Sequence, residues 1–258
     1  MPDHQKPGPH VSAANNSVIV QPGGRTFPSI GAALASITDN KRQKQYSLYV
    51  GPGVYKEKVK MKPFVTIEGA GRDVTTITQP AAADAFSGGT VMAASNCTLA
   101  NVTVSSLGGH WGSYSTAVSC SGAINFSLDN STLIVDDQNQ AGVNQCALNA
   151  SLNTFEPPSK IRVSYCAIKC AAQNNQSGSI TAGIAEHSTA QFFNSKLIAT
   201  GGRQPFGVIT ARNSPVTLDN CYIEGSFYAL YDSDRSAIIT ANHCQIHGPV
   251  SEGVVVNK

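Results

Sequence analysis

The stretch "VTLDNCYIEG", residues 216–225, carries the pattern that decides the fold. Its first half alternates apolar residues at Val216 and Leu218. Its second half places a small residue, Cys221, two positions before the branched Ile223. Alternation with a period of two is typical of a β-strand with one buried face. Asn220 lies between the halves and tolerates turn conformations. The stretch therefore predicts two short strands joined by a sharp turn.

The same phrase recurs along the chain as "NCTL" at 96, "NSTL" at 130, "YCAI" at 165, "NSKL" at 194, "NCYI" at 220 and "HCQI" at 243. Aligned on the small second residue, the copies are 34, 35, 29, 26 and 23 residues apart. A repeat of this length with variable insertions predicts stacked coils, because one coil cannot bury its inner face alone. We therefore expect an all-β fold, a right-handed parallel β-helix, that forms a single domain over residues 17–258.

The aligned small residues are expected to form one inward column, where they fill the core. The asparagines before them are expected to stack at the turn. The column comprises Cys97, Ser131, Cys166, Ser195, Cys221 and Cys244, and the asparagines are Asn96, Asn130, Asn194 and Asn220.

The segment "TFPSIGAALASIT", about residues 26–38, is expected to form a helix that covers the open N-terminal end of the stack. Thr26 is a candidate N-cap and Pro28 suits a first turn. The apolar face of this helix would comprise Phe27, Ile30, Leu34 and Ile37. Residues 1–16 are polar and rich in proline and glycine, and we expect a flexible arm there.

Composition narrows the function classes. Only 13% of the 258 residues are charged, the net charge is +2, and no basic run supports binding to nucleic acid. No apolar run is long enough to cross a membrane. The seven cysteines include no C-x-x-C pair, so neither a metal nor another cofactor is predicted. We expect a cytoplasmic protein as written, or a secreted one if a signal peptide has been removed. A monomer or a homodimer is expected.

The ordered segments "TFPSIGAALASI", "YVGPGVYKEKV" and "VTIEGAGRDVTTIT" resemble the opening of the pectin methylesterase (pectinesterase) family. The resemblance implies a pectin-lyase-like β-helix, in which the G-x-Y-x-E turn at Gly53, Tyr55 and Glu57 builds the first coil. It also implies that the chemistry lies on the outer face of one sheet. There the family uses an aspartate nucleophile, a second aspartate as acid, an arginine and glutamines.

The family's catalytic motifs match this chain only in part. The family's Q-A-V motif aligns with residues 116–118. Its Q-D-T-L motif aligns with residues 145–148, where Cys146 replaces the aspartate that acts as the acid. Its D-F-I-F-G motif aligns with residues 182–186, which contain no aspartate. Alignment of its L-G-R-P-W motif places Tyr231 in the position of the arginine. An alternative register, anchored on residues 223–225, puts Phe206 and Gly207 on the Q-D pair and Tyr228 on the second aspartate. Either register predicts a divergent member without the aspartate pair and the arginine.

Four residues are candidates for catalysis. Tyr231 and Asp232 are candidate acid and base, although acidic turns are common without chemistry. Gln145 keeps the position of a family glutamine. Cys146 is a candidate nucleophile if His187 or His110 lowers its pKa, and inert packing is the alternative.

Substrate contacts are expected around the same face. The loop "SSLGGHWGSYS", residues 105–115, brings aromatic and imidazole side chains to the start of the first strand there, and a ring folded onto the coil is the alternative for its tryptophan. Further candidates lie at the ends of later strands. For the charged residues among them, the alternative is a row of solvated charges that binds no ligand. The candidate binding residues are His110, Trp111, Tyr114, Thr116, His187, Arg212 and Tyr228.

Three functions are compatible with the sequence. The first is a scaffold repurposed to bind a small organic molecule and to transform it without hydrolysis, as a cofactor-free cyclase or isomerase would. The second is a carbohydrate-binding protein without catalysis, for which the partner would be a sugar-like ligand. The third is a pectin methylesterase-like hydrolase that uses non-standard residues, with Cys146 as the leading candidate.

Overall fold

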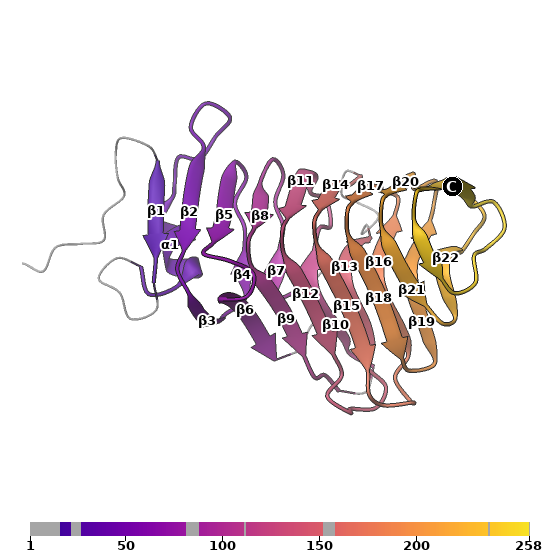
Figure 1. The fold of residues 1–258 in the computed structure, drawn as a ribbon. Coiled ribbons are helices and arrows are strands. Elements are labelled where there is room, and N and C mark those ends of the chain that lie inside the picture. Colours follow the sequence, from indigo (N-terminus) through magenta and orange to yellow (C-terminus); the bar gives the residue numbers. More distant parts are fainter. Residues whose placement is uncertain are drawn as a thin grey trace, which may run out of the picture.

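The computed structural model describes residues 16–21, 27–80, 88–110, 112–151, 158–236 and 238–257. Most of the predicted arm and all of Trp111 lie outside these residues. The strands form three sheets, each of which runs the length of the molecule (Figure 1). Every strand pair within the sheets is parallel.

The bounds of the strands follow the coil order. The ten-stranded sheet contains β1 (Ser17–Val20), β2 (Tyr46–Val50), β5 (Val65–Gly69), β8 (Thr98–Ala100), β11 (Ile124–Asp129), β14 (Lys160–Ser164), β17 (Thr189–Phe193), β20 (Val216–Asp219), β23 (Ile239–Asn242) and β25 (Val255–Asn257). The eight-stranded sheet contains β3 (Gly53–Lys56), β6 (Thr75–Pro80), β9 (Thr103–Leu107), β12 (Thr132–Asp136), β15 (Ala167–Ala172), β18 (Lys196–Gly201), β21 (Tyr222–Gly225) and β24 (Gln245–His247). The seven-stranded sheet contains β4 (Val59–Lys60), β7 (Val91–Met92), β10 (Tyr114–Ser119), β13 (Asn144–Ser151), β16 (Ser179–Glu186), β19 (Gln204–Ala211) and β22 (Tyr228–Asp232).

The chain visits the ten-, eight- and seven-stranded sheets in turn and then starts the next coil, as in β2, β3, β4 and β5. This order confirms the predicted right-handed parallel β-helix. Each coil hydrogen-bonds to its neighbours through all three sheets, so the backbone groups inside the stack are satisfied between coils.

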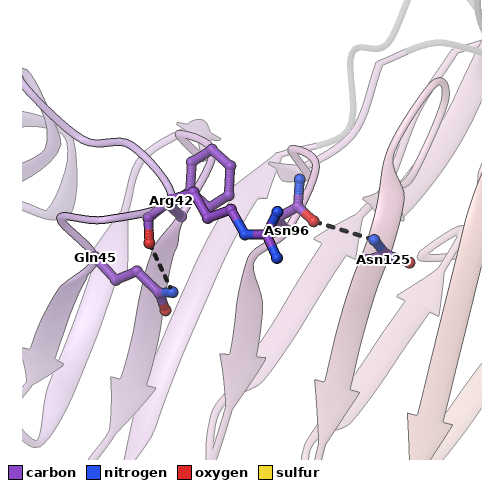
Figure 2. A pocket seen from close by; sticks show the side chains of 5 residues that line it. Arg42, Gln45, Asn96 and Asn125 are labelled. Atoms are coloured by element: carbon purple, nitrogen blue, oxygen red, sulfur yellow. Dashed lines mark hydrogen bonds between the residues drawn. The ribbon is translucent and has the colours of Figure 1, made fainter.

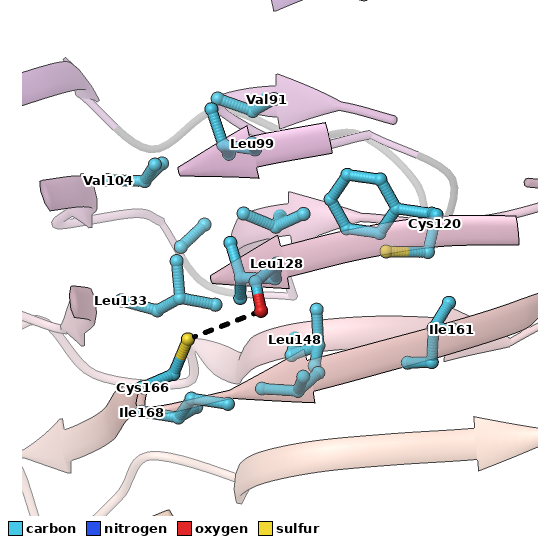
Figure 3. Packing of buried hydrophobic residues seen from close by; sticks show 14 of the residues in the cluster. Val91, Leu99, Val104, Cys120, Leu128, Leu133, Leu148, Ile161, Cys166 and Ile168 are labelled. Atoms are coloured by element: carbon cyan, nitrogen blue, oxygen red, sulfur yellow. Dashed lines mark hydrogen bonds between the residues drawn. The ribbon is translucent and has the colours of Figure 1, made fainter. Parts of the chain in front are cut away.

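The core is a column of apolar side chains stacked between coils (Figure 3). Leu133 lies level with Ile168 across the β12–β15 pair, and both are fully buried. Burial of such a side chain stabilises the fold by about 1.5–3 kcal/mol. The Cys166 thiol donates to the carbonyl oxygen of Leu128 at 3.6 Å and packs as a small core residue.

The structure corrects the first copy of the repeat. Ser131 precedes β12 of the eight-stranded sheet, whereas Cys97 precedes β8 of the ten-stranded sheet. Thr132 pairs with Thr103, so the copy before "NSTL" is "NVTV" at 101–104. Cys97 therefore lies outside the predicted column, because a second corner of the coil also uses asparagine followed by a small residue.

Asparagines do stack at the corner between the ten- and eight-stranded sheets. The Asn130 amide donates to Asn101 at 2.7 Å, and the Asn220 amide donates to Asn194 at 2.6 Å. These residues have positive φ, which asparagine tolerates better than most residues. Tyr165 occupies the same corner with φ of 57° and interrupts the ladder.

The N-terminal helix is shorter than expected and has a different cap. Helix α1 spans Ile30–Ser36, and the hydroxyl of Ser29 accepts from the N–H of Ala32 at 3.1 Å. Thr26 lies outside the described residues. Of the predicted apolar face, Ile30 and Leu34 lie within α1 and are buried. Phe27 and Ile37 are buried too, but they lie just outside the helix.

The G-x-Y-x-E motif forms strand β3 and not the expected turn, and its last residue, Glu57, directly follows β3 and holds this helix in place. Its two carboxylate oxygens accept from the N–H groups of Ile30 and Gly31, each at 2.8 Å. These N–H groups have no partner within the helix, and the helix dipole favours a negative charge there. Glu57 therefore ties the capping helix to the first coil.

Candidate functional site

The seven-stranded sheet carries most of the predicted site residues, but they fall into two groups. Thr116 and Cys146 lie level with one another on β10 and β13. The same row continues through Thr181 and Phe206 to Tyr228 on β22. Neighbouring strands are about 4.8 Å apart, so Cys146 and Tyr228 are about 14 Å apart. The two groups cannot act on the same reacting atom.

Gln145 points into the stack. Its side chain is 2% exposed, and its Oε1 accepts from the Cys170 thiol at 3.6 Å. Cys170 belongs to β15 of the eight-stranded sheet, so this contact crosses the interior. Gln145 therefore does not lie where the family resemblance placed an oxyanion donor. Strand alternation turns it inward.

Cys146 does not have the surroundings of a nucleophile. It is 5% exposed, and its thiol donates to the carbonyl oxygen of Leu148 at 3.2 Å. Burial raises the pKa of this thiol far above its usual value, and Glu186 raises the pKa further. A reactive cysteine needs the opposite shift, usually from a nearby cation. The alternative reading of Cys146 as inert packing agrees with this geometry.

The C-terminal end of the sheet presents an aromatic wall, which we define as Phe206, Phe227, Tyr228 and Tyr231. The rings of Tyr228 and Tyr231 are 4.7 Å apart between centroids, and the ring of Phe206 lies 5.3 Å from that of Tyr231. Phe227 packs edge-on against Phe206 at 5.3 Å and is 42% exposed. Contacts of this kind stabilise one another and hold the rings in a fixed arrangement.

A pocket of about 330 Å³ adjoins the aromatic wall. The segment after β24 returns beside β22 to form its other side: Val250 bridges Leu230, and the N–H of Ser251 donates to the Leu230 carbonyl at 3.0 Å. The Ser251 hydroxyl accepts from the N–H of Asp232 at 2.9 Å. The pocket is lined by Tyr228, Tyr231, Asp232, Ser233, Arg235, Val250, Ser251 and Glu252.

The structure thus brings together three of the predicted residues, Tyr228, Tyr231 and Asp232. It adds contributors from residues 250–252 that the sequence analysis missed. No signal in the repeat marked this segment, because it joins the site only when the chain folds back along the last strand. Arg235 faces Glu252 across the pocket rim at 3.6 Å, but both side chains are largely exposed, so their attraction is weak.

The other predicted binding residues lie elsewhere. His187 and Arg212 are exposed at consecutive coil corners with positive φ, and the N–H of Arg212 donates to Asp234 at 2.9 Å. Neither lines the pocket. Thr116 is 2% exposed, and Tyr114 is partly buried and lies level with Asn144.

His110 belongs to a loop that is tied down. Its N–H donates to the Ser113 hydroxyl at 2.8 Å, and the N–H of Gly109 donates to the Gln140 side chain of the next coil at 2.5 Å. Buried Asp137 holds the facing loops by accepting from the N–H groups of Asn139 and Gln173, both at 2.9 Å. These loops border the starts of β10 and β13 in the middle of the seven-stranded sheet, where β16 separates β13 from β19 of the aromatic wall.

Within the described strands of the seven-stranded sheet, the only carboxylates are Glu186 and Asp232. Glu186 pairs with Ala211, and Asp232 pairs with Thr210, so β19 separates the two. Asp232 is 6% exposed. The two groups therefore do not face one another, as a nucleophile and an acid would have to.

A further hollow, of about 550 Å³, lies at the corner that leads into the ten-stranded sheet. Figure 2 shows the Arg42 side chain extending toward Asn96, while the Gln45 amide donates to the Arg42 carbonyl at 3.2 Å and the Asn125 amide donates to Asn96 at 3.1 Å. The hollow lies far from the aromatic wall along the stack and offers no carboxylate or histidine in its lining. Among the residues that the structure describes, no group of His, Cys, Asp and Glu could hold a metal ion. No described helix is long and apolar enough to span a membrane.

Solved pectin methylesterases share this fold. The chain is similar to the pectin methylesterase of Aspergillus niger, with a TM-score of 0.63 and 16% identity over 97% of this chain and 83% of that one. The carrot pectin methylesterase gives a TM-score of 0.55 and 13% identity over 96% of this chain and 89% of that one. A pectin methylesterase solved in complex with a hexasaccharide gives a TM-score of 0.53 and 12% identity over 96% of this chain and 82% of that one.

No protein-family profile matches the sequence. No curated protein matches it either. At these identities, the structural likeness establishes a pectinesterase-like β-helix and leaves the activity to be argued from the site.

Proposed function

We propose that this chain is a divergent pectinesterase-like protein that binds a small ring-containing organic molecule at the aromatic wall and converts it without hydrolysis, as a cofactor-free cyclase or isomerase. The observation that carries the proposal is the pocket of about 330 Å³ beside the wall, in a sheet whose two carboxylates do not face one another. Aromatic faces suit ring stacking, and two of the three charged residues in the lining, Arg235 and Glu252, face one another at 3.6 Å.

The residues suggest how such a conversion would proceed. Tyr228 and Tyr231 would hold the substrate ring in a reactive shape, which alone can lower a barrier substantially. The Tyr231 hydroxyl would donate a proton or a hydrogen bond to the atom that gains charge, and the Asp232 carboxylate would accept a proton from the substrate. Both residues border the same pocket, which supports these roles.

A second candidate, carbohydrate binding without turnover, is favoured by the aromatic wall and by the similar protein solved with a hexasaccharide. Sugar rings also stack on aromatic faces. A third, hydrolysis of pectin methyl esters by non-standard residues, has less support, because the Cys146 thiol is buried and its pKa is raised.

Two measurements separate these functions. We expect no methanol from methylated pectin, and methanol release by the wild-type protein would refute the proposal. Ligand-detected NMR with a mixture of mono- and bicyclic aromatic compounds should show binding that Tyr231→Ala abolishes. The matched control is Tyr49→Ala, which removes another exposed tyrosine, 45% exposed on β2.

The outcomes are distinct. Binding of ring compounds that survives Tyr231→Ala would place the ligand elsewhere and contradict the proposal. Binding of oligogalacturonate that Tyr231→Ala abolishes, without binding of the aromatic mixture, would establish the carbohydrate-binding alternative. For any ring compound that binds, incubation followed by mass spectrometry and chromatography should reveal a product of equal mass, as isomerisation or cyclisation requires.

A further inference from the structure

A separate hollow of about 520 Å³ lies at the corner between the ten- and eight-stranded sheets. It is built on the asparagine ladder and on the starts of β15 and β18, and it contains no residue of the aromatic wall. Its lining consists of Arg72, Asn130, Tyr165, Cys166, Ala167, Lys169, Asn194 and Lys196.

The lining is positively charged. Arg72, Lys169 and Lys196 converge on the hollow. Lys196 pairs with Ala167 on the neighbouring strand, and Lys169 lies two residues after Ala167. The two lysines are therefore on adjacent strands, which are about 4.8 Å apart, and are offset by two residues along the strand direction. In the described part of the chain, none of the three cations forms a salt bridge. Three cations around one hollow repel one another, and a bound anion would offset this repulsion.

No described carboxylate lines this hollow, although Asp129, Glu68 and Asp219 lie in one row near the ends of strands of the ten-stranded sheet at the same corner. Asp129 ends β11 beside Asn130, and it acts electrostatically on the same Cys166 thiol as Arg72 does. None of these carboxylates lines the hollow, whereas all three cations do. The arrangement therefore favours an anion of more than one charge.

Tyr165 marks the hollow as more than a charged surface. The corner residues on either side of it along the stack are Asn130 and Asn194, and Tyr165 adopts the same left-handed conformation although a bulky side chain disfavours it. Its ring is 59% exposed. The Arg72 guanidinium donates to the backbone carbonyl of Tyr165 at 3.3 Å, which ties this cation to the same corner residue. The corner thus presents an exposed aromatic ring in a hollow that three cations line.

We propose that this hollow binds a small polyvalent anion that carries a ring. The ring stacks on Tyr165, and a phosphate or a set of carboxylates contacts Arg72, Lys169 and Lys196. A guanidinium and ammonium groups suit both kinds of anion. The site is independent of the proposed function, because it shares no residue with the pocket at Tyr231.

Isothermal titration calorimetry at low ionic strength tests the site with three probes. 4-Nitrophenyl phosphate supplies a ring and a phosphate, inorganic phosphate lacks the ring, and benzene-1,3,5-tricarboxylate replaces the phosphate with carboxylates. The variants are Lys169→Gln, Lys196→Gln and Tyr165→Asn. The last one is expected to fold, because asparagine continues the ladder. Lys160→Gln, on the ten-stranded sheet, is the matched control for loss of a charge.

We expect 4-nitrophenyl phosphate or the tricarboxylate to bind, and the tighter of the two identifies the anionic group. Each lysine variant should weaken binding about fivefold, which is typical of a partly exposed ion pair, and added salt should weaken it further. Tyr165→Asn should reduce the affinity for 4-nitrophenyl phosphate to that for inorganic phosphate. Lys160→Gln and Tyr231→Ala should leave binding unchanged.

Failure to bind any probe at millimolar concentration would overturn the proposal. The same holds if Lys160→Gln weakens binding as much as Lys169→Gln does, since the effect would then be general electrostatic attraction. If Tyr165→Asn leaves the affinity for 4-nitrophenyl phosphate unchanged, the ring does not stack there and the proposal is wrong in its choice of ligand.

Discussion

Replacement of Glu57 should loosen the cap of the β-helix by an amount that its contacts allow us to calculate. Its carboxylate accepts two hydrogen bonds of 2.8 Å from the N–H groups of Ile30 and Gly31. A hydrogen bond to a charged group contributes about 1.5–3 kcal/mol. Since Glu57 is only partly buried, we take the lower value for each bond. Glu57→Ala should then lower the free energy of unfolding by about 3 kcal/mol.

Glu57→Gln is the sharper variant, because it changes the shape of the side chain very little. Its amide oxygen can accept from one of the two N–H groups, but its NH2 group would face the other. We expect a loss of about 1.5–2 kcal/mol, between wild type and Glu57→Ala. Glu252→Gln removes a carboxylate that is exposed at the other end of the stack and should change stability by less than about 0.5 kcal/mol.

Urea unfolding followed by far-UV circular dichroism gives these free energies, and hydrogen exchange at the amides of Ile30 and Gly31 reports on the cap directly. The exchange rate of both amides should rise in Glu57→Ala. If this variant loses less than about 1 kcal/mol and both amides stay protected, Glu57 does not hold the helix and our account of the cap is wrong.

Other predictions concern the core and the corners. Tyr165→Asn should raise the free energy of unfolding by about 1 kcal/mol, because it restores a stacked amide and relieves a left-handed tyrosine; a loss of stability in urea would contradict this. Burial raises the pKa of thiols such as Cys120 well above the usual value, so they stay protonated in the folded protein while the unfolded chain ionises. Stability should therefore fall as the pH rises above about 8.5, by about 1.4 kcal/mol per pH unit for each such thiol, and a thermal melt that does not change between pH 8 and pH 10 would exclude this effect. Hydrogen bonding from its neighbour lowers the pKa of the partly exposed Cys244 thiol to about 7, so iodoacetamide should label it first, with a rate that rises through pH 7, as peptide mass spectrometry can verify. Gly69→Ala would place a methyl group 2.4 Å from the Asn101 carbonyl oxygen and should cost about 2–4 kcal/mol in the same urea assay, whereas a near-neutral result would mean that the coils separate easily.

Much of the fold follows from local patterns. The alternation around Val216 and Leu218 predicted strands, and these are β20 and its partners. The spacing of Ser131, Cys166 and Ser195 predicted the coil, and the three residues do precede β12, β15 and β18. Each of these signals depends on residues only a few positions apart, which is why the sequence reveals them.

The errors arose where two places in the coil look alike. Asn96 and Asn101 both begin a turn followed by a strand, and only the pairing of Thr132 with Thr103 shows which one continues the ladder. Gln145 was assigned to the outer face from a motif match. A shift by one residue turns a strand side chain to the opposite face, so a motif at low identity does not fix the direction.

The sequence by itself determined the period of the coil, the strand and turn residues within it and the helix that covers its N-terminal end, because these depend on neighbouring residues. Only the tertiary structure decided which side chains meet across coils. It separated Cys146 from Tyr231, turned Gln145 inward and brought residues 250–252 back to Asp232. The physical reason is that contacts between coils depend on the exact pairing of strands 20 to 40 residues apart, and no local preference specifies that pairing.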